Sequence, residues 1–237
     1  MTDMKLMNSQ VDLGAESGED AQRSTAVFEA RLRALRECRR DIAAEINEQR
    51  RIDFDLDEAE LLIELERNEE AHRLARSGFD SAMHEKSWQQ AVRSCDLIFE
   101  CGLDDALIAL GQGVWLSVSF PIEPELTMTM LQHIIDDTPD DADGAAVAAA
   151  TALYVINLRA TGRVLEDLQF FANQMIANVA RRHSDITEQS AFDHWVKRME
   201  LDDPEKFLVR LRNIVDVLVQ DEWWFDRDRV RDDMPTH

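Results

Sequence analysis

The stretch from Gly144 to Arg182 reads GAAVAAATALYVINLRATGRVLEDLQFFANQMIANVARR, and its pattern decides the fold. Its first half, residues 145–158, contains only two polar residues, Thr151 and Asn157. A helix that is apolar on every side cannot face water, so we expect this half at the centre of a helical bundle. The second half, after Gly162, is amphipathic and is expected to cover one side of the first.

The overall composition agrees with a helical protein. A chain of 237 residues, 45% of them apolar, is long enough to bury a sizeable core. One tyrosine, eight glycines and five prolines are poor material for a sheet protein, which needs strand-forming residues and many turns. We therefore predict an all-α fold, either an irregular helical bundle or an array of helical hairpins.

The N-terminal part predicts a helical hairpin over residues 24–76. Residues 1–23 are polar, acidic and without a pattern, and we expect them to be disordered. A first helix over residues 24–50 carries a heptad-like apolar seam, made by Phe28, Leu32, Leu35, Ile42 and Ile46. The hairpin either projects as a coiled-coil-like arm or packs on the main bundle, and its seam could also join two copies of the chain.

The link between the two helices of this hairpin reads RIDFDLD over residues 51–57. Its aspartates alternate with three apolar residues, Ile52, Phe54 and Leu56. This period of two predicts an extended connector. The second helix is then expected over residues 58–76, ended by Ser77 and Gly78.

The main bundle is expected over residues 79–225 as short helices that pair into hairpins. Two of these helices have proline in the first turn, at Pro124 and Pro204. Hairpins that begin near residues 87, 124 and 163 suggest a repeat, although the residues of a tetratricopeptide repeat are missing. The last helix is expected to reach Phe225, and residues 226–237 to form a flexible tail.

The charge balance restricts the partners. The chain has 26 lysines and arginines against 48 aspartates and glutamates, which gives a net charge of −22. Such a surface repels phosphates and anionic lipid head groups, so we expect neither nucleic acid nor a membrane as partner, but a basic or amphipathic protein. Cys38, Cys95 and Cys101 lack metal-site spacing and are expected as free thiols in the cytoplasm, with Cys95 and Cys101 in the core.

Two acidic motifs have part of the spacing of a metal site but lack an essential position. The set Asp53, Asp55, Asp57 and Glu64 matches a calcium loop, yet Glu58 stands where that loop needs glycine. The motif Glu69-Glu70-Ala71-His72 is a single Glu-x-x-His, whereas a di-iron bundle needs two.

Two histidines, His133 and His194, stand near apolar faces and are expected to be buried and hydrogen-bonded. No phosphate-binding loop or nucleophile motif is present in the sequence. We therefore assign no catalytic, cofactor-binding or metal-binding residue and expect a protein that is not an enzyme.

The densest aromatic cluster in the sequence is Trp223-Trp224-Phe225. On a helix these three rings would span most of the circumference, so at least one should be exposed or meet another segment, such as the one containing Phe192 and Trp195. Two interpretations remain open: an aromatic lid that closes one end of the bundle, or an anchor that binds a partner.

Five arginines form a basic cluster on the first helix: Arg31, Arg33, Arg36, Arg39 and Arg40. Pairing with the acidic second helix is the simplest interpretation. An anionic partner is the alternative, although the field of the whole protein opposes it. We name Arg36 and Arg40, together with the aromatic residues above, as candidate partner-binding residues.

These observations predict a non-enzymatic cytoplasmic interaction module, such as an adaptor, an accessory subunit or a dedicated chaperone. One alternative is a helical enzyme or cofactor-binding protein whose pocket lies beside the central hairpin, lined by Tyr154, Asn157, His133 and Trp115. A further alternative is an acidic inhibitor that mimics DNA, which would use the negative charge directly.

Overall fold

A computed structural model describes residues 18–42 and 46–234, and the regular secondary structure of this part of the chain is helical. Within these ranges there are 11 helices and no strand, which confirms the predicted all-α class. None of the helices in the described part is both long and apolar enough to cross a bilayer. The helices are α1 (Gly18–Asp41), α2 (Glu48–Glu64), α3 (Asn68–His84), α4 (Trp88–Glu100), α5 (Ala106–Ser119), α6 (Pro124–Asp137), α7 (Asp143–Arg159), α8 (Gly162–Ser184), α9 (Gln189–Arg198), α10 (Pro204–Val219) and α11 (Arg227–Arg231).

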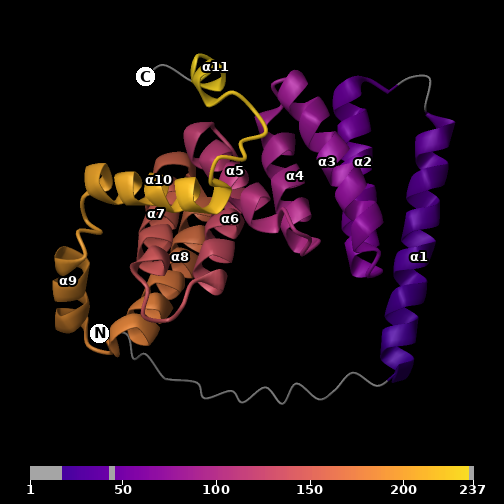
Figure 1. Cartoon of the computed structure of the whole chain (residues 1–237). Coiled ribbons are helices and arrows are strands. Elements are labelled where there is room, and N and C mark those ends of the chain that lie inside the picture. Colours follow the sequence, from indigo (N-terminus) through magenta and orange to yellow (C-terminus); the bar gives the residue numbers. More distant parts are fainter. Residues whose placement is uncertain (1–17, 43–45, 235–237) are drawn as a thin grey trace.

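The helices form an array in which each of the first seven packs on the next (Figure 1). The array starts with α1 at one edge and runs through α4 into the group formed by α5 to α8. Helix α10 then crosses back and packs on both α5 and α7. Because α10 joins helices that are distant in the sequence, it closes the core over the middle of the array.

The central hairpin is α7 and α8, as the sequence predicts. The six residues from Ala145 to Ala150 are each at most 5% exposed, and α7 packs on α6, α8 and α10. Thr151 donates to the carbonyl oxygen of Val147 at 2.8 Å, so the polar group buried in this helix is satisfied locally. Small side chains allow three neighbouring helices to approach α7 at once.

Two arginines at the ends of α7 and α8 bind the C-terminal ends of earlier helices. The guanidinium of Arg159 donates to the carbonyl oxygens of Ser117 and Val118 at 2.7 and 2.9 Å, in the last turn of α5. Arg182 donates to the carbonyl oxygen of Ile135 at 2.6 Å, in the last turn of α6. The last carbonyl groups of a helix have no partner within that helix, so a cation placed there stabilises its end.

The predicted extended connector is wrong, because residues 51–57 lie inside α2. The first helix ends at Asp41, before the expected residue 50, and Asn47 caps α2 by accepting from the amide of Arg50 at 2.9 Å. The three alternating apolar residues are all at most 4% exposed. Helix α2 packs on α1 and also on α3 and α4. A helix that is buried on two sides carries apolar residues on both of these sides. In a short stretch of sequence, such residues can alternate with polar ones as they do in a β-strand.

The predicted end of the second helix at Gly78 is also wrong. The chain turns instead near Glu66, whose φ of 57° lies in the left-handed region, and Gly78 is in the middle of α3. A Cβ atom at Gly78 would lie 2.9 Å from Cδ2 of Leu56. This glycine therefore permits close packing of α3 on α2 and does not mark a helix end.

Helix α1 packs along α2 and does not project as an arm. Leu32 in the predicted seam is only 1% exposed, and Arg36 of the same face bonds to α2. The middle of the seam, at Leu32, is thus covered within the chain.

Both ends of the predicted helical domain need correction. Helix α1 begins at Gly18, inside the segment expected to be disordered, while residues 1–17 lie outside the described part. The last long helix ends at Val219 and does not reach Phe225. The expected flexible tail contains α11, which Asp226 caps by accepting from two amides. Residues 235–237 are outside the described part.

Candidate functional site

Two adjacent aromatic residues, Phe170 and Phe171, lie on the outer surface of α8. Phe170 is 60% exposed and Phe171 is 57% exposed. Their rings are 5.6 Å apart in an edge-to-face arrangement. Helix α8 meets the core through its other side, where Leu168 and Ala172 are buried. The amphipathic pattern of the helix is therefore interrupted by two large apolar rings on the solvent side.

Further apolar side chains are exposed at the turn between α7 and α8. Leu158, in the last turn of α7, is 64% exposed, and Val164, in the first turn of α8, is 47% exposed. We define the α8 surface as these two residues together with Phe170 and Phe171. The exposed groups of this surface are apolar, so it offers apolar contact.

Two clefts flank α8 on either side. The first, of about 370 Å³ between α6 and α8, is lined by Phe171, Met128 and Met175 and also by polar Gln132 and Asp136. The second, of about 350 Å³, is formed by residues of α7 to α10 and the loop before α10. Apolar residues in its lining include Leu153, Tyr154, Ile176, Phe192 and Phe207. Clefts of this size can accept side chains of a docked segment.

The charged groups beside the α8 surface are mostly acidic. Glu166 and Asp167 are exposed on α8 itself, and Asp136 lines the first cleft. Arg163 is the cation on this part of α8, and it is 3.8 Å from a carboxylate oxygen of Asp167. An apolar patch with an acidic border results.

The cluster Trp223-Trp224-Phe225 lies in the segment between α10 and α11, which is not helical, and the three rings are half-buried. The Trp224 ring packs edge-to-face on Phe79 at 5.2 Å, and the guanidinium of Arg76 lies 4.2 Å from its centroid. The Trp224 amide donates to Gln112 at 2.9 Å. The rings thus pack on residues of α3 and α5 within the chain, as the lid interpretation expects. Partner binding by the three residues stays a prediction.

The expected meeting of this cluster with Trp195 is wrong. Trp195 is 1% exposed and packs on Phe192 and His183, with ring centroids 5.9 Å away in both cases. Its indole nitrogen donates to Nδ1 of His183 at 3.4 Å. Trp195 thus anchors α9 to the end of α8. A residue so deeply buried contributes no contact surface in this conformation.

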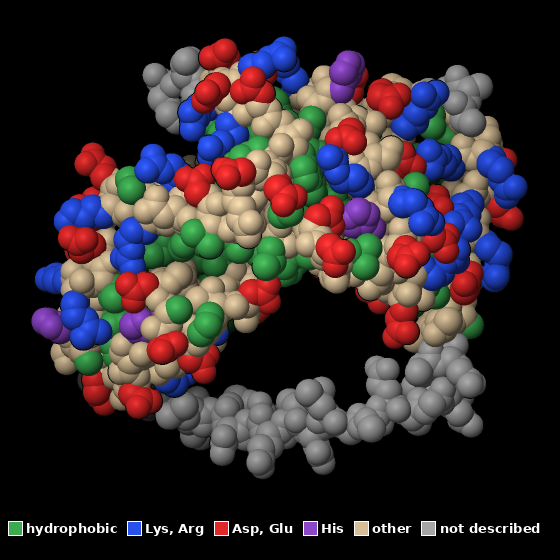
Figure 2. Space-filling view, viewed as in Figure 1, with side chains coloured by type: hydrophobic (Ala, Val, Ile, Leu, Met, Phe, Trp, Pro, Cys, Tyr) green, Lys and Arg blue, Asp and Glu red, His purple; other side chains and the backbone are tan. Residues whose placement is uncertain are grey.

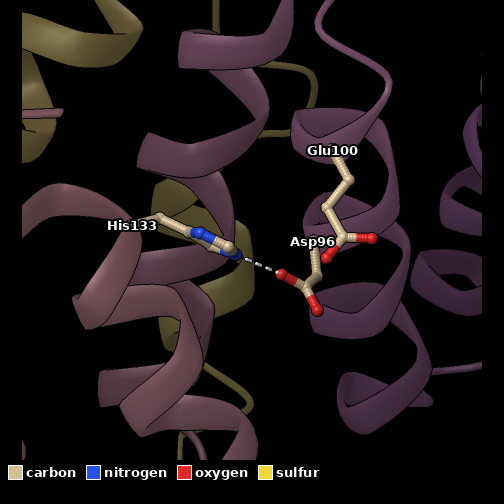
Figure 3. A group of neighbouring side chains, drawn as sticks. All are labelled: Asp96, Glu100 and His133. Carbon is tan, nitrogen blue, oxygen red and sulfur yellow. Dashed lines mark hydrogen bonds and ion pairs between the residues drawn. The ribbon is translucent and has the colours of Figure 1, made fainter. Parts of the chain in front are cut away.

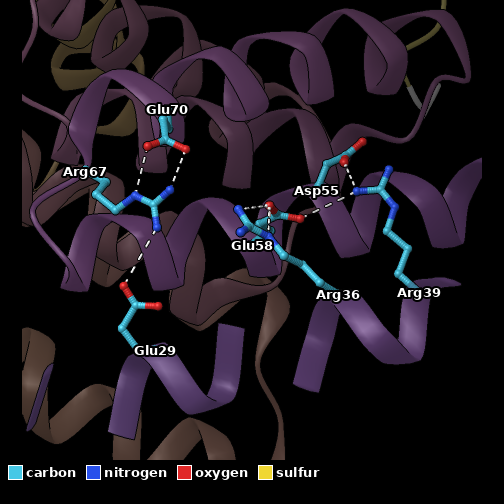
Figure 4. A network of polar contacts seen from close by, with 7 residues as sticks. All are labelled: Glu29, Arg36, Arg39, Asp55, Glu58, Arg67 and Glu70. Carbon is cyan, nitrogen blue, oxygen red and sulfur yellow. Dashed lines mark hydrogen bonds and ion pairs between the residues drawn. The ribbon is translucent and has the colours of Figure 1, made fainter. Parts of the chain in front are cut away.

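The arginines of α1 divide into two groups. Arg36 donates to Glu58 at 2.8 Å and Arg39 to Asp55 at 2.6 Å, which confirms the predicted pairing with the acidic helix (Figure 4). Burial raises the pKa of Asp55, against the opposing effect of Arg39. Arg40 is exposed and only 4.0 Å from Glu37, and basic side chains gather over α1 on the face shown in Figure 2.

Helices α4 and α6 bring together Asp96, Glu100 and His133, a grouping that the sequence analysis did not predict (Figure 3). Nε2 of His133 is 2.7 Å from Oδ1 of Asp96. Burial disfavours the charged imidazolium, but the hydrogen bond and charge of Asp96 outweigh it and raise the pKa of His133. Burial, followed by the charge of Asp96, raises the pKa of Glu100.

The two predicted histidines differ in their outcome. His133 is partly buried and hydrogen-bonded, close to the prediction, whereas His194 is exposed and the prediction for it is wrong. The four residues expected to share one pocket do not meet in one place. Tyr154 and Asn157 line the second cleft, His133 lines the first, and Trp115 packs against Trp223 and Phe225.

The burial of Cys95 and Cys101 agrees with the sequence analysis. Cys95 and Cys101 are buried, and Cys38 is exposed. Burial raises the pKa of the Cys101 thiol to about 11. The aspartates of the calcium-like motif lie on the continuous helix α2, which has no loop to surround an ion.

A comparison with protein-family models, with curated proteins and with solved structures finds no match to this chain.

Proposed function

We propose that this protein is an interaction module, an adaptor or accessory subunit, that binds a basic amphipathic segment of a protein partner on the α8 surface. The observation that carries the proposal is the exposure of two adjacent aromatic rings, Phe170 and Phe171. Aromatic side chains are enriched at the cores of protein interfaces relative to other surfaces.

The contrast with the other aromatic residues supports this choice. Trp195 is buried, and the cluster Trp223-Trp224-Phe225 is half-buried against Phe79 and Trp115. The rings of Phe170 and Phe171 pack on each other, and each residue is still more than half exposed. A large aromatic side chain removes about 150–250 Å² of surface from water when it is fully buried, and more than half of each of these two residues is still available for a partner to cover.

The surrounding charge indicates the chemistry of the partner. Carboxylates of Asp136, Glu166 and Asp167 border the patch, and the whole chain has a net charge of −22. Opposite charge on the partner speeds encounter and fixes orientation. A partner helix with one apolar face would place its apolar side chains between the two clefts. Its flanking lysines or arginines would then lie over the carboxylates that border the patch.

The test is a native pull-down followed by mass spectrometry with three proteins. These are the wild type, the double variant Phe170→Ser/Phe171→Ser, and the control Val217→Ser, which changes a residue that is 73% exposed on α10. We expect a partner with a basic amphipathic segment in the wild type and control eluates and its loss from the double variant. A photo-crosslinker at Gln174, which lines the first cleft, should label the same segment.

Two results would contradict the proposal. One is a partner that binds the double variant as strongly as the wild type. The other is recovery of no partner by any of the three proteins under native conditions. A bound small molecule or a basic DNA-binding protein displaced by DNA would instead favour the cofactor-binding or the DNA-mimic alternative.

A further inference from the structure

We propose that Asp96, Glu100 and His133 form a binding site for a divalent transition-metal ion such as Zn²⁺. The three residues come from two helices that are separate in the sequence, α4 and α6. Asp96 and Glu100 are four positions apart, which places both carboxylates on the same face of α4. His133 approaches this face from α6 (Figure 3).

The distances suit a single ion. One ligand atom from each residue, the imidazole nitrogen and a carboxylate oxygen from each acid, lies within 4.8 Å of the other two. Zinc binds nitrogen and oxygen at about 2.0–2.2 Å, so two atoms bound to the same ion are roughly 3–4 Å apart. Small side-chain rotations would bring the three atoms to this separation.

The imidazole is already oriented toward the carboxylates. Its Nε2 atom is 2.7 Å from Oδ1 of Asp96, and its ring packs on Phe99 with centroids 4.5 Å apart. An ion would occupy the place of the proton shared between His133 and Asp96. The packing on Phe99 limits rotation of the ring, which reduces the entropy lost on binding.

Glu100 is the residue that distinguishes a metal site from a simple ion pair. Its carboxylate has neither a hydrogen bond nor an ion pair with any residue in the described part of the chain. An interhelical pair of Asp96 and His133 needs no third group. One nitrogen and two carboxylate oxygens are a donor set of zinc and related first-row ions, and a fourth position would remain open to water.

The experiment is calorimetric titration of the full chain with ZnCl₂, without an affinity tag and in a Cys38→Ser background that removes the exposed thiol. Glu100→Gln removes one ligand and leaves the Asp96–His133 pair intact. The matched control is Glu64→Gln, which removes an exposed carboxylate that is not one of the three ligands. The charge of Glu64 acts electrostatically on Glu100, so the control reproduces the loss of a nearby negative charge. Thermal unfolding of each protein with and without zinc provides a second measurement.

We expect one saturable site per chain in the background protein and in Glu64→Gln, with a higher midpoint of unfolding when zinc is present. Glu100→Gln should weaken zinc binding at least about tenfold, because removal even of groups that only support metal ligands has effects of this size. Absence of a saturable site, or equal affinity of Glu100→Gln and Glu64→Gln, would overturn the proposal.

Discussion

Arg159 binds the carbonyl oxygen of Ser117, 42 residues earlier in the chain, at 2.7 Å. The guanidinium is partly buried, and within the described residues its hydrogen bonds go to carbonyl and hydroxyl oxygens, those of Ser117, Val118, Ile122 and Thr127. Burial without a carboxylate partner lowers the pKa of Arg159. The contact links the end of α5 to the end of α7, so it ties the first half of the bundle to its centre.

Replacing Arg159 with methionine should destabilise the protein by about 1–3 kcal/mol, because it leaves buried carbonyl groups without donors. Urea-induced unfolding measures the change. The control is Arg163→Met on α8, whose side chain is 91% exposed and which should change the free energy of unfolding by less than about 0.5 kcal/mol. If the two variants were equally stable, the carbonyl groups released by Arg159→Met would be hydrogen-bonded to water.

Two helical glycines should respond in opposite ways to alanine. A Cβ atom at Gly111 would lie 2.5 Å from Val219 and 3.3 Å from the backbone oxygen of Val215, so Gly111→Ala should cost about 1–3 kcal/mol by pushing α10 away. A Cβ atom at Gly144 meets nothing closer than 3.6 Å, so Gly144→Ala should stabilise by about 0.5–1 kcal/mol. Thermal unfolding of both variants gives the comparison, and a stabilised Gly111→Ala would show that α10 is loosely packed.

A leucine at Ala149 should also destabilise the protein, by about 1–3 kcal/mol, because this residue of α7 is fully buried. The control is Ala30→Leu on the exposed side of α1, which adds the same atoms without a clash. If thermal unfolding of Ala149→Leu were unchanged, α7 would not be the centre of the bundle.

The contribution of His133 to stability should decrease as pH rises. The pKa of His133 in the folded chain is raised above the ordinary value of 6.5, so its charge stabilises the folded state fully below that value. This stabilisation is lost as pH increases through the raised pKa. The free energy of unfolding of the wild type minus that of His133→Gln, measured in EDTA from about pH 6 to about pH 9, should therefore fall. A difference that stays constant or grows would contradict the assigned direction.

Only one of the three thiols should react in the folded protein. Cys38 is exposed, while Cys95 and Cys101 are buried with raised thiol pKa values. A disulfide reagent at about pH 8 should modify one thiol per native chain and three in denaturant. The variant Cys38→Ser should lose the fast reaction, and rapid modification of a second thiol would show that the array opens locally.

The sequence predicts the parts of this fold that depend on local chemistry. Pro124 and Pro204 start helices, and the all-apolar run before Gly162 forms the central helix. Prediction fails in α2, because burial on two sides depends on α1 and α3 and gives Ile52, Phe54 and Leu56 the pattern of a strand. The prediction of a helix end at Gly78 fails for a similar reason, because this glycine permits the close approach of Leu56 on α2 and does not form a turn.

The candidate site was only partly within reach of sequence reasoning. Phe170 lies two positions from buried Leu168 and two from buried Ala172, and this spacing places it on the opposite side of α8. That signal is present in the sequence. The sequence carries no signal for the contact between His133 and Asp96, because these residues are 37 positions apart and the contact depends on how α6 packs near α4.

The two arginine contacts at the helix ends have a consequence for synthesis of the chain. The carbonyl groups of α5 and α6 are made first, and their donors, Arg159 and Arg182, follow at the ends of α7 and α8. A nascent chain that stops before residue 159 contains α5 and α6 but not the groups that complete them. The centre of the bundle is therefore complete only after α8 has been synthesised, and a truncated chain that ends before residue 159 lacks the donors for both helix ends.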